Sequence, residues 1–187
     1  DNGLYIATED GGLNYLNNRK EITRAERLHK QMQIYAKNIH SLWLDKDNSL
    51  WLGLFLKGAL HYIPHLNRTV DYNLLSEEVS SGFCIIEDKN DHVWYGGPSG
   101  LFLIDKKKAN ARPEKISPLR IFNLVQFNDS ILWAGTRKGS MFQINTRTLK
   151  VTSLPILPHT DLYVTYIYPD SHQRIWIGTD NNGLYVS

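Results

Sequence analysis

Short apolar segments recur along the chain, and each is ended by a glycine or by a polar turn. In the clearest copy, Ile175–Thr179 carries β-branched and aromatic residues of the kind that favour a strand. Asn181-Asn182-Gly183 follows, and these residues tolerate the positive φ angles of a tight hairpin turn. A second apolar run begins at Leu184. The pattern therefore predicts two antiparallel strands joined by a short turn.

This strand–turn–strand pattern occurs five times. Each copy has an aromatic residue two positions before a small residue, and an apolar run follows the next glycine. The aromatic residues are Tyr5, Trp51, Trp94, Trp133 and Trp176. Successive members of this set are 46, 43, 39 and 43 residues apart. A period of roughly 40–45 residues, rich in strands and turns, is typical of β-propeller blades.

Each repeat is expected to form a four-stranded antiparallel sheet, so the fold class is all-β. An apolar first strand precedes the strand that carries the tryptophan. A residue with a short polar side chain ends this first strand: Asp45, Asp88, Asn128 or Asp170. This side chain is expected to accept a backbone N–H two residues on and start a turn. The tryptophans are expected to be buried between blades. The glycine two residues later shares the tryptophan's face and is expected to leave room for a large side chain of the next blade.

Composition narrows the classes of function. The chain has 187 residues, of which 42% are hydrophobic, and a formal net charge of +2. These values suit one globular domain and give no indication of contact with nucleic acid or an anionic membrane. No apolar run is long enough to span a bilayer. Cys84 is the only cysteine, so no internal disulfide can form, and its apolar neighbours predict a buried strand residue.

The sequence predicts no catalytic residues, no metal site and no cofactor. His61 and His65 are four residues apart, but Pro64 and the strand setting argue against a helical metal site. Adjacent carboxylates such as Glu87 and Asp88 point to opposite faces of a strand, so they make poor acid–base pairs. No glycine-rich phosphate loop and no nucleophile elbow is present.

The repeats resemble a known family. Tyr5–Tyr15 and Ile175–Thr179 resemble the two-component regulator propeller repeat, and the resemblance covers essentially the whole chain. It implies the periplasmic sensor region of a hybrid histidine kinase held in the inner membrane. It also implies an oligosaccharide ligand and control of genes for polysaccharide use. The implied partners are the remaining blades and a C-terminal sensor domain of the same receptor, and a homodimer is a further expectation.

The register of the repeats predicts an incomplete ring. Residue 1 falls in the second strand of one blade and residue 187 in the third strand of another. Residues 1–187 are therefore expected to form a β-propeller fragment of about four and a half blades. The resemblance implies a seven-bladed ring, and a closed five-bladed ring is the alternative. The uncovered ends of a fragment are expected to self-associate or to lower its stability.

The candidate ligand-binding residues lie on loops between second and third strands, where propellers usually bind ligands. Aromatic, amide and charged side chains suit sugars, because a ring stacks on a sugar face and polar groups bind hydroxyls. The predicted residues are Asp10, Phe55, Lys57, Arg137, Lys138, Asp180 and Asn181. The loops that lead into first strands add Asn38, His40, His159 and Asp161. Arg137, Lys138 and Lys57 suit a uronate or a sulfate. The alternative for each residue is a solvated hairpin tip.

Two other classes of function stay open at this point. One is a glycosidase or lyase on a propeller, which carboxylates converging on the channel would favour. The other is a protein-interaction scaffold, which a large exposed apolar face would favour.

Overall fold

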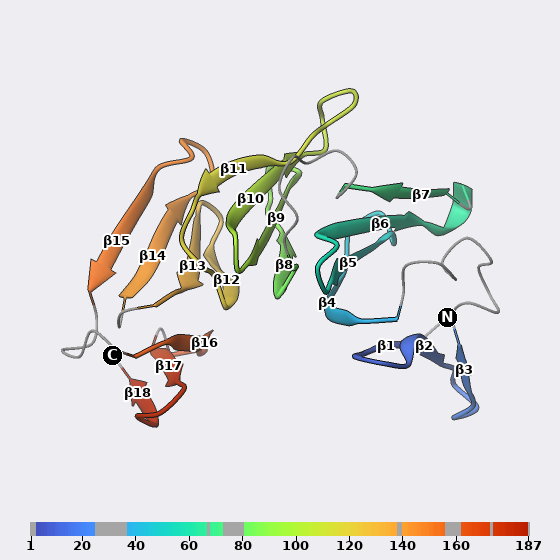
Figure 1. The fold of residues 1–187 in the computed structure, drawn as a ribbon, viewed down its shortest axis with the longest axis horizontal. Coiled ribbons are helices and arrows are strands. Elements are labelled where there is room, and N and C mark those ends of the chain that lie inside the picture. Colours follow the sequence, from blue (N-terminus) through green and yellow to red (C-terminus); the bar gives the residue numbers. More distant parts are fainter. Residues whose placement is uncertain are drawn as a thin grey trace. The chain divides into compact units, whose positions relative to one another are not determined.

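The computed structural model describes residues 3–24, 37–66, 68–72, 81–137, 140–155, 162–172 and 174–186. In these residues the chain is built from antiparallel sheets, with one short 3-10 helix at Pro64–Leu66 (Figure 1). The chain divides into two compact units, Asp1–Gly82 and Phe83–Ser187. Each unit is described by itself.

The first unit contains two sheets. One has the order β1 (Leu4–Thr8), β2 (Gly12–Leu16) and β3 (Ile22–Arg24). The other has the order β4 (Ile39–Leu44), β5 (Leu50–Leu54), β6 (Ala59–Ile63) and β7 (Arg68–Asp71). Leu13 of β2 packs with apolar side chains of β4, β5 and β6 in one buried cluster. Neighbouring sheets therefore bury their apolar faces against each other, as blades do.

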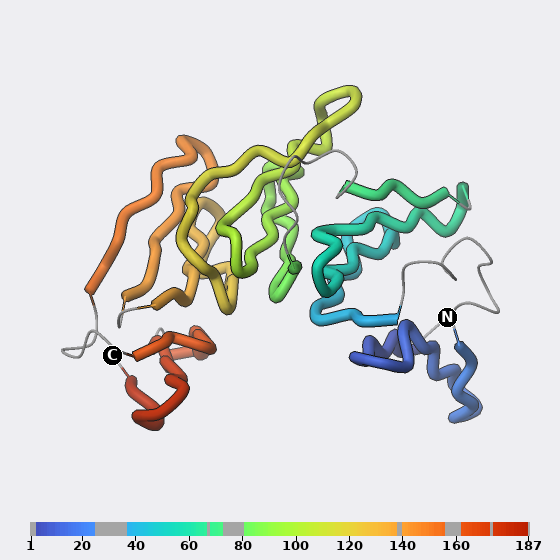
Figure 2. The backbone as a smooth tube through the Cα atoms, in the orientation of Figure 1, coloured from blue at the N-terminus to red at the C-terminus, as the bar shows by residue number. Residues whose placement is uncertain are grey.

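The second unit contains three sheets. The first has β8 (Cys84–Glu87), β9 (His92–Gly97), β10 (Gly100–Asp105) and β11 (Glu114–Ser117). The second has β12 (Asn123–Asn128), β13 (Ile131–Gly135), β14 (Ser140–Asn145) and β15 (Val151–Pro155). The third has β16 (Val164–Pro169), β17 (Ile175–Thr179) and β18 (Leu184–Val186). The connection from β10 to β11 extends away from its sheet (Figure 2).

The predicted fold class is confirmed. Strands follow one another within each sheet in chain order, and β8, β12 and β16 form the edges along which consecutive sheets of the second unit meet. The predicted position of the first and last sheets within the repeat is also confirmed. β1 carries Tyr5 and β17 carries Trp176, and these are the aromatic residues expected on second strands. Within the second unit the sheets are therefore arranged as propeller blades, with first strands innermost.

The tryptophans of the repeat lie inside the protein, as predicted. Trp51 and Trp94 are fully buried, and Trp133 is 8% exposed. Trp176, in the last sheet, is half-buried. Cys84 is buried in β8, also as predicted, and burial raises the pKa of its thiol to about 12. The thiol is therefore protonated at neutral pH.

An aspartate after the first strand holds the tryptophan of the second strand. Asp45, Asp88 and Asp170 each accept the backbone N–H groups two and four residues on through Oδ1. Through Oδ2 each accepts the indole N–H six residues on, at 3.2, 2.8 and 3.0 Å respectively. The sequence predicted the bond at the second residue but not the bond to the indole. We call this arrangement the Asp–Trp clip.

The β12–β13 sheet lacks the clip. Asn128 stands five residues before Trp133 rather than six, and a register shift at the end of β12 accompanies this shorter connection. The Asn128 amide oxygen accepts the N–H of Ser130, as the turn prediction requires. Among the described residues, however, the buried indole nitrogen of Trp133 has no hydrogen-bond partner. One residue less in the turn thus removes the bond.

Gly96 and Gly135 each lie against the start of the next first strand. A Cβ at Gly96 would lie 2.6 Å from Cγ2 of Ile121, so the predicted contact with a large side chain is confirmed there. At Gly135 backbone comes closer than any side chain, because a Cβ would overlap the carbonyl oxygen of Val164, whereas Cγ1 of Val164 would lie 3.2 Å away.

Hydrogen bonds explain this close approach. The N–H groups of Ile121 and Val164 donate to the carbonyl oxygens of Gly97 and Thr136, at 3.0 and 2.9 Å. Each bond ties the start of a first strand to the residue that follows the glycine of the preceding sheet. The glycine therefore sets where the next first strand begins.

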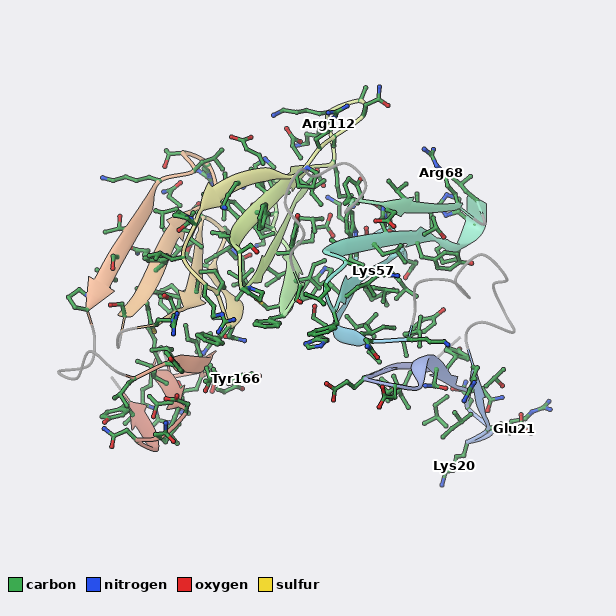
Figure 3. The ribbon with its side chains drawn as sticks, viewed as in Figure 1. Lys20, Glu21, Lys57, Arg68, Arg112 and Tyr166 are labelled. Atoms are coloured by element: carbon green, nitrogen blue, oxygen red, sulfur yellow. The ribbon has the colours of Figure 1, made fainter. Side chains whose placement is uncertain are left out.

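One face of the last sheet is apolar and exposed. Tyr166 (labelled in Figure 3) and Tyr168 of β16, with Leu184 and Val186 of β18, are each more than half exposed. Strand register places these side chains on the same face as Trp176. The opposite face of this sheet packs against the sheet of β12–β15.

Candidate functional site

Three aromatic rings line up where the three first strands of the second unit begin. Phe83, Phe122 and Tyr163 immediately precede β8, β12 and β16. The ring centroids of Phe83 and Phe122 are 6.5 Å apart with an interplanar angle of 18°. Those of Phe122 and Tyr163 are 5.4 Å apart at 32°. All three side chains are half-buried, so their rings form a continuous surface, which we call the aromatic strip.

Two arginines accompany the aromatic strip. The guanidinium carbon of Arg120 lies 6.0 Å from the ring centroid of Phe83 and 5.8 Å from that of Phe122. The guanidinium of Arg137 lies 5.1 Å from the Tyr163 ring and donates to its hydroxyl at 2.9 Å. These distances are those of cation–π contacts. In the part of the chain that the structure describes, no carboxylate forms an ion pair with either guanidinium.

Backbone hydrogen bonds hold the strip in place. The N–H groups of Phe83 and Phe122 donate to the carbonyl oxygens of Gly96 and Gly135, at 2.8 and 2.9 Å. These two acceptors are the glycines of the tryptophan-containing strands. Both bonds lie within a sheet, so the pairing of the first strand with the second strand of the same blade positions these two rings.

The aromatic strip ends at the turn between β17 and β18. The Tyr163 N–H donates to Oδ1 of Asp180 at 3.1 Å, and its carbonyl oxygen accepts the Asp180 N–H at 3.3 Å. The exposed Asp180 carboxylate is thus the acidic group at this end of the strip. It lies next to the ring that Arg137 covers.

The structure brings some of the predicted ligand-binding residues together. Arg137 and Asp180 meet at Tyr163, whereas Asn181 is exposed in the β17–β18 turn. Lys138 lies outside the described residues, as do His159 and Asp161.

The remaining predicted residues belong to the first unit. Asp10 is exposed in the β1–β2 turn. Phe55 is 45% exposed in the β5–β6 turn and stacks on His40, with ring centroids 5.4 Å apart. Lys57 (labelled in Figure 3) lies on the same turn and is exposed. The first unit therefore has a smaller aromatic pair of its own.

The sequence prediction missed Phe83, Phe122, Tyr163 and Arg120. Each of the three aromatic residues stands in an apolar segment of the kind predicted to form a first strand, so its residue type alone does not indicate exposure. The available signal was positional, because an aromatic residue stands at or next to the start of the apolar segment in each of these three repeats. Only the packing of the sheets shows that these rings are half-exposed and adjacent.

A buried Asp–Ser–His cluster in the first unit does not have the geometry of a catalytic triad. The Ser49 hydroxyl donates to Oδ2 of Asp45 at 2.7 Å and lies 2.5 Å from Nε2 of His61. Ser49 thus stands between the carboxylate and the imidazole, whereas in a catalytic triad the histidine stands between the serine and the aspartate. His61 also stacks on Trp51, with centroids 4.0 Å apart. The cluster supports the core rather than a reaction.

Comparison with known proteins agrees with this architecture. Residues 159–181 match the family model described as the two component regulator propeller. The chain is 27% identical over 177 residues to histidine kinase P4 of Formosa agariphila, a match that covers 84% of this chain and 13% of that protein.

Solved structures share the fold over almost the whole chain. The extracellular domain of a putative one component system from B. thetaiotaomicron has a TM-score of 0.80 at 23% identity, covering 98% of this chain and 25% of that one. The extracellular domain of a putative hybrid two component system from the same organism has a TM-score of 0.77 at 20% identity, with the same coverage. The resemblance to two-component regulator propeller repeats is thus confirmed. The chain spans about a quarter or less of the length of these relatives.

Proposed function

We propose that this chain is part of the ligand-sensing propeller of a hybrid two-component receptor, and that it binds an oligosaccharide on the aromatic strip. The likeness to a histidine kinase and to extracellular domains of two-component systems supports the receptor assignment. The proposed location is the periplasm, as part of an inner-membrane receptor that controls polysaccharide use. Among the residues the structure describes, no helix has the length and apolar character needed to cross a membrane.

The chain itself is proposed to bind rather than to catalyse. The kinase activity of such a receptor would reside in another part, and the blades and C-terminal sensor domain of that receptor would be its partners. In the described residues, no group of three His, Cys, Asp or Glu side chains could hold a metal ion.

One observation supports oligosaccharide binding above all. Three half-exposed rings stand at corresponding positions of consecutive sheets, with centroid spacings of 6.5 and 5.4 Å. Aromatic faces bind the apolar faces of sugar rings, and a row of them suits a chain of sugars better than a single one. The adjacent guanidinium groups supply hydrogen-bond donors for hydroxyl or acidic substituents.

The test is calorimetric titration of the chain with linear oligosaccharides of neutral hexoses, of uronates and of sulfated hexoses. Phe122→Ala removes the central ring and is expected to weaken binding about tenfold, the order of one aromatic stacking contact. Phe127→Ala is the matched control, because Phe127 lies on β12, the strand that follows Phe122, but contacts Trp133 rather than the strip. Absence of binding by every oligosaccharide, or equal loss in the two variants, would refute the proposal.

Protein association is a second candidate function, which the exposed apolar face of the last sheet favours. Tyr166, Tyr168, Leu184 and Val186 together form an apolar patch next to a half-buried tryptophan. Such patches mark interaction surfaces. We propose that a second copy of the chain, or another blade of the same receptor, covers this face.

A further inference from the structure

We propose that the aromatic strip selects acidic oligosaccharides, and that Arg120 and Arg137 are the residues that determine this specificity. The inference rests on the proposed oligosaccharide-binding function and adds the chemical class of the ligand. The shared chemistry is an anionic oxygen group on a sugar, either a uronate carboxylate or a sulfate ester.

The two guanidinium groups are placed to receive anions. Each lies within 6.0 Å of a ring centroid. This contact engages the charge through the ring face, and within the described ranges most of the in-plane N–H groups have no acceptor. Arg137 uses one of its donors on the Tyr163 hydroxyl. The planar fork of the remaining donors matches carboxylate and sulfate oxygens, which can bind two N–H groups at once.

The surroundings of Arg120 make an anion favourable there. Arg120 is half-buried beside Phe83 and Phe122, where water screens a charge less than at an open surface. No carboxylate among the described residues compensates it. A ligand anion would supply the missing charge partner without moving any part of the strip.

The positions of the arginines along the strip indicate more than one acidic group. Arg120 contacts the first and second rings, whereas Arg137 covers the third. A sugar chain lying along the rings would therefore meet one cation near Phe83 and Phe122 and another at Tyr163. The ligand that fits is an oligosaccharide whose acidic groups repeat along the chain.

Asp180 opposes this selection at one end. Its carboxylate is held by the Tyr163 backbone, so it lies beside the ring where Arg137 would bind the second anion. Asp180→Asn keeps the Oδ1 acceptor and removes the charge. This substitution should therefore strengthen the binding of an acidic ligand, which a merely structural role of Asp180 would not do.

The experiment compares ligands that differ only at their acidic groups. Oligogalacturonate is titrated against its fully methyl-esterified form, and a sulfated galactan oligosaccharide against its desulfated form. Each acidic ligand that binds is expected to bind at least tenfold more tightly than its neutral counterpart, and to weaken as salt is raised. The two pairs separate carboxylate from sulfate as the source of the anion.

Variants test the two arginines directly. Arg120→Gln and Arg137→Gln are each expected to lower the affinity for the acidic ligand about tenfold, and to lower the affinity for the neutral ligand by a smaller factor, because a bond to a charged group contributes more than one to a hydroxyl. Arg112→Gln is the control for charge. Arg112 (labelled in Figure 3) is exposed on the β10–β11 connection, and the order of the strands places it at the opposite edge of its sheet from Phe83. Thermal melting checks that every variant folds, and Asp180→Asn must shift the affinity in the opposite direction.

The outcomes separate the two proposals. If neutral and acidic ligands bind equally, if the arginine variants behave like Arg112→Gln, or if Asp180→Asn leaves the affinity unchanged, the acidic selection is refuted. Oligosaccharide binding then stands, provided that Phe122→Ala still weakens it. If no oligosaccharide binds at all, the proposed function and this inference both fail.

Discussion

The clearest energetic test compares two tryptophans that occupy the same position in neighbouring sheets. Trp94 and Trp133 are both buried in the second unit. The Trp94 indole N–H donates to the buried carboxylate of Asp88 at 2.8 Å, whereas the Trp133 indole nitrogen has no partner among the described residues. Substitution by phenylalanine removes the same atoms at both positions. The loss of apolar volume therefore largely cancels in the comparison.

The difference in hydrogen bonding sets the expected magnitude. Trp94→Phe removes a bond to a charged group, which contributes about 1.5–3 kcal/mol. Trp133→Phe removes an unsatisfied buried donor, which relieves a cost of about 1–3 kcal/mol. Asp88 keeps its bonds from Asn90 and His92, so the value for Trp94→Phe should lie near its lower limit. Trp94→Phe is expected to lower the free energy of unfolding by at least about 2 kcal/mol more than Trp133→Phe.

Urea unfolding followed by far-UV circular dichroism measures this difference, because it does not depend on tryptophan fluorescence. Both residues belong to the same unit, so both variants report on the same transition, and equal m-values would confirm comparable unfolded states. Equal losses of stability, or a larger loss for Trp133→Phe, would show that the clip does not stabilise the fold as described.

Three further predictions concern the blade contacts, pH and association. Gly135→Ala is expected to destabilise the chain by about 1–3 kcal/mol, because the added Cβ meets backbone of the next first strand. Gly178→Ala is the control in urea unfolding, since its Cβ would lie 3.4 Å from the nearest atom. Similar losses of stability in the two variants would contradict the close-approach argument. The Trp176 indole N–H, with N–H groups of residue 174, holds the pKa of Asp170 well below its usual range. The stability that this carboxylate contributes should be complete above the unfolded pKa of about 4 and should be lost as pH falls toward the lower folded pKa. Between pH 6 and 2.5, the free energy of unfolding of Asp170→Asn should therefore depend less on pH than that of the wild type. Parallel pH profiles would refute the stabilising role of the Asp170 carboxylate. Light scattering over a range of concentrations should show self-association that Tyr166→Ser reduces, whereas a strictly monomeric chain would argue against a second copy on that face.

The sequence by itself determined the repeat and its local structure. A spacing of about 40–45 residues, apolar runs ended by turns and an aromatic residue two positions before a small one were enough to predict four-stranded blades. The turn at Asp45 or Asp170 was also predictable, because an aspartate side chain bonds to a backbone N–H only two residues away. These features depend on neighbouring residues and on periodicity, which the order of amino acids contains directly.

Only the tertiary structure decided which distant groups meet. The bond from Trp94 to Asp88 crosses a turn, and in the next sheet one residue less removes it. The aromatic strip joins residues about 40 positions apart, and their contact depends on how closely each first strand approaches the glycine of the preceding sheet. Phe122 has the same apolar character whether it is buried in a core or half-exposed at the edge of a sheet. Its role is set by packing between blades, a long-range property that no local pattern encodes.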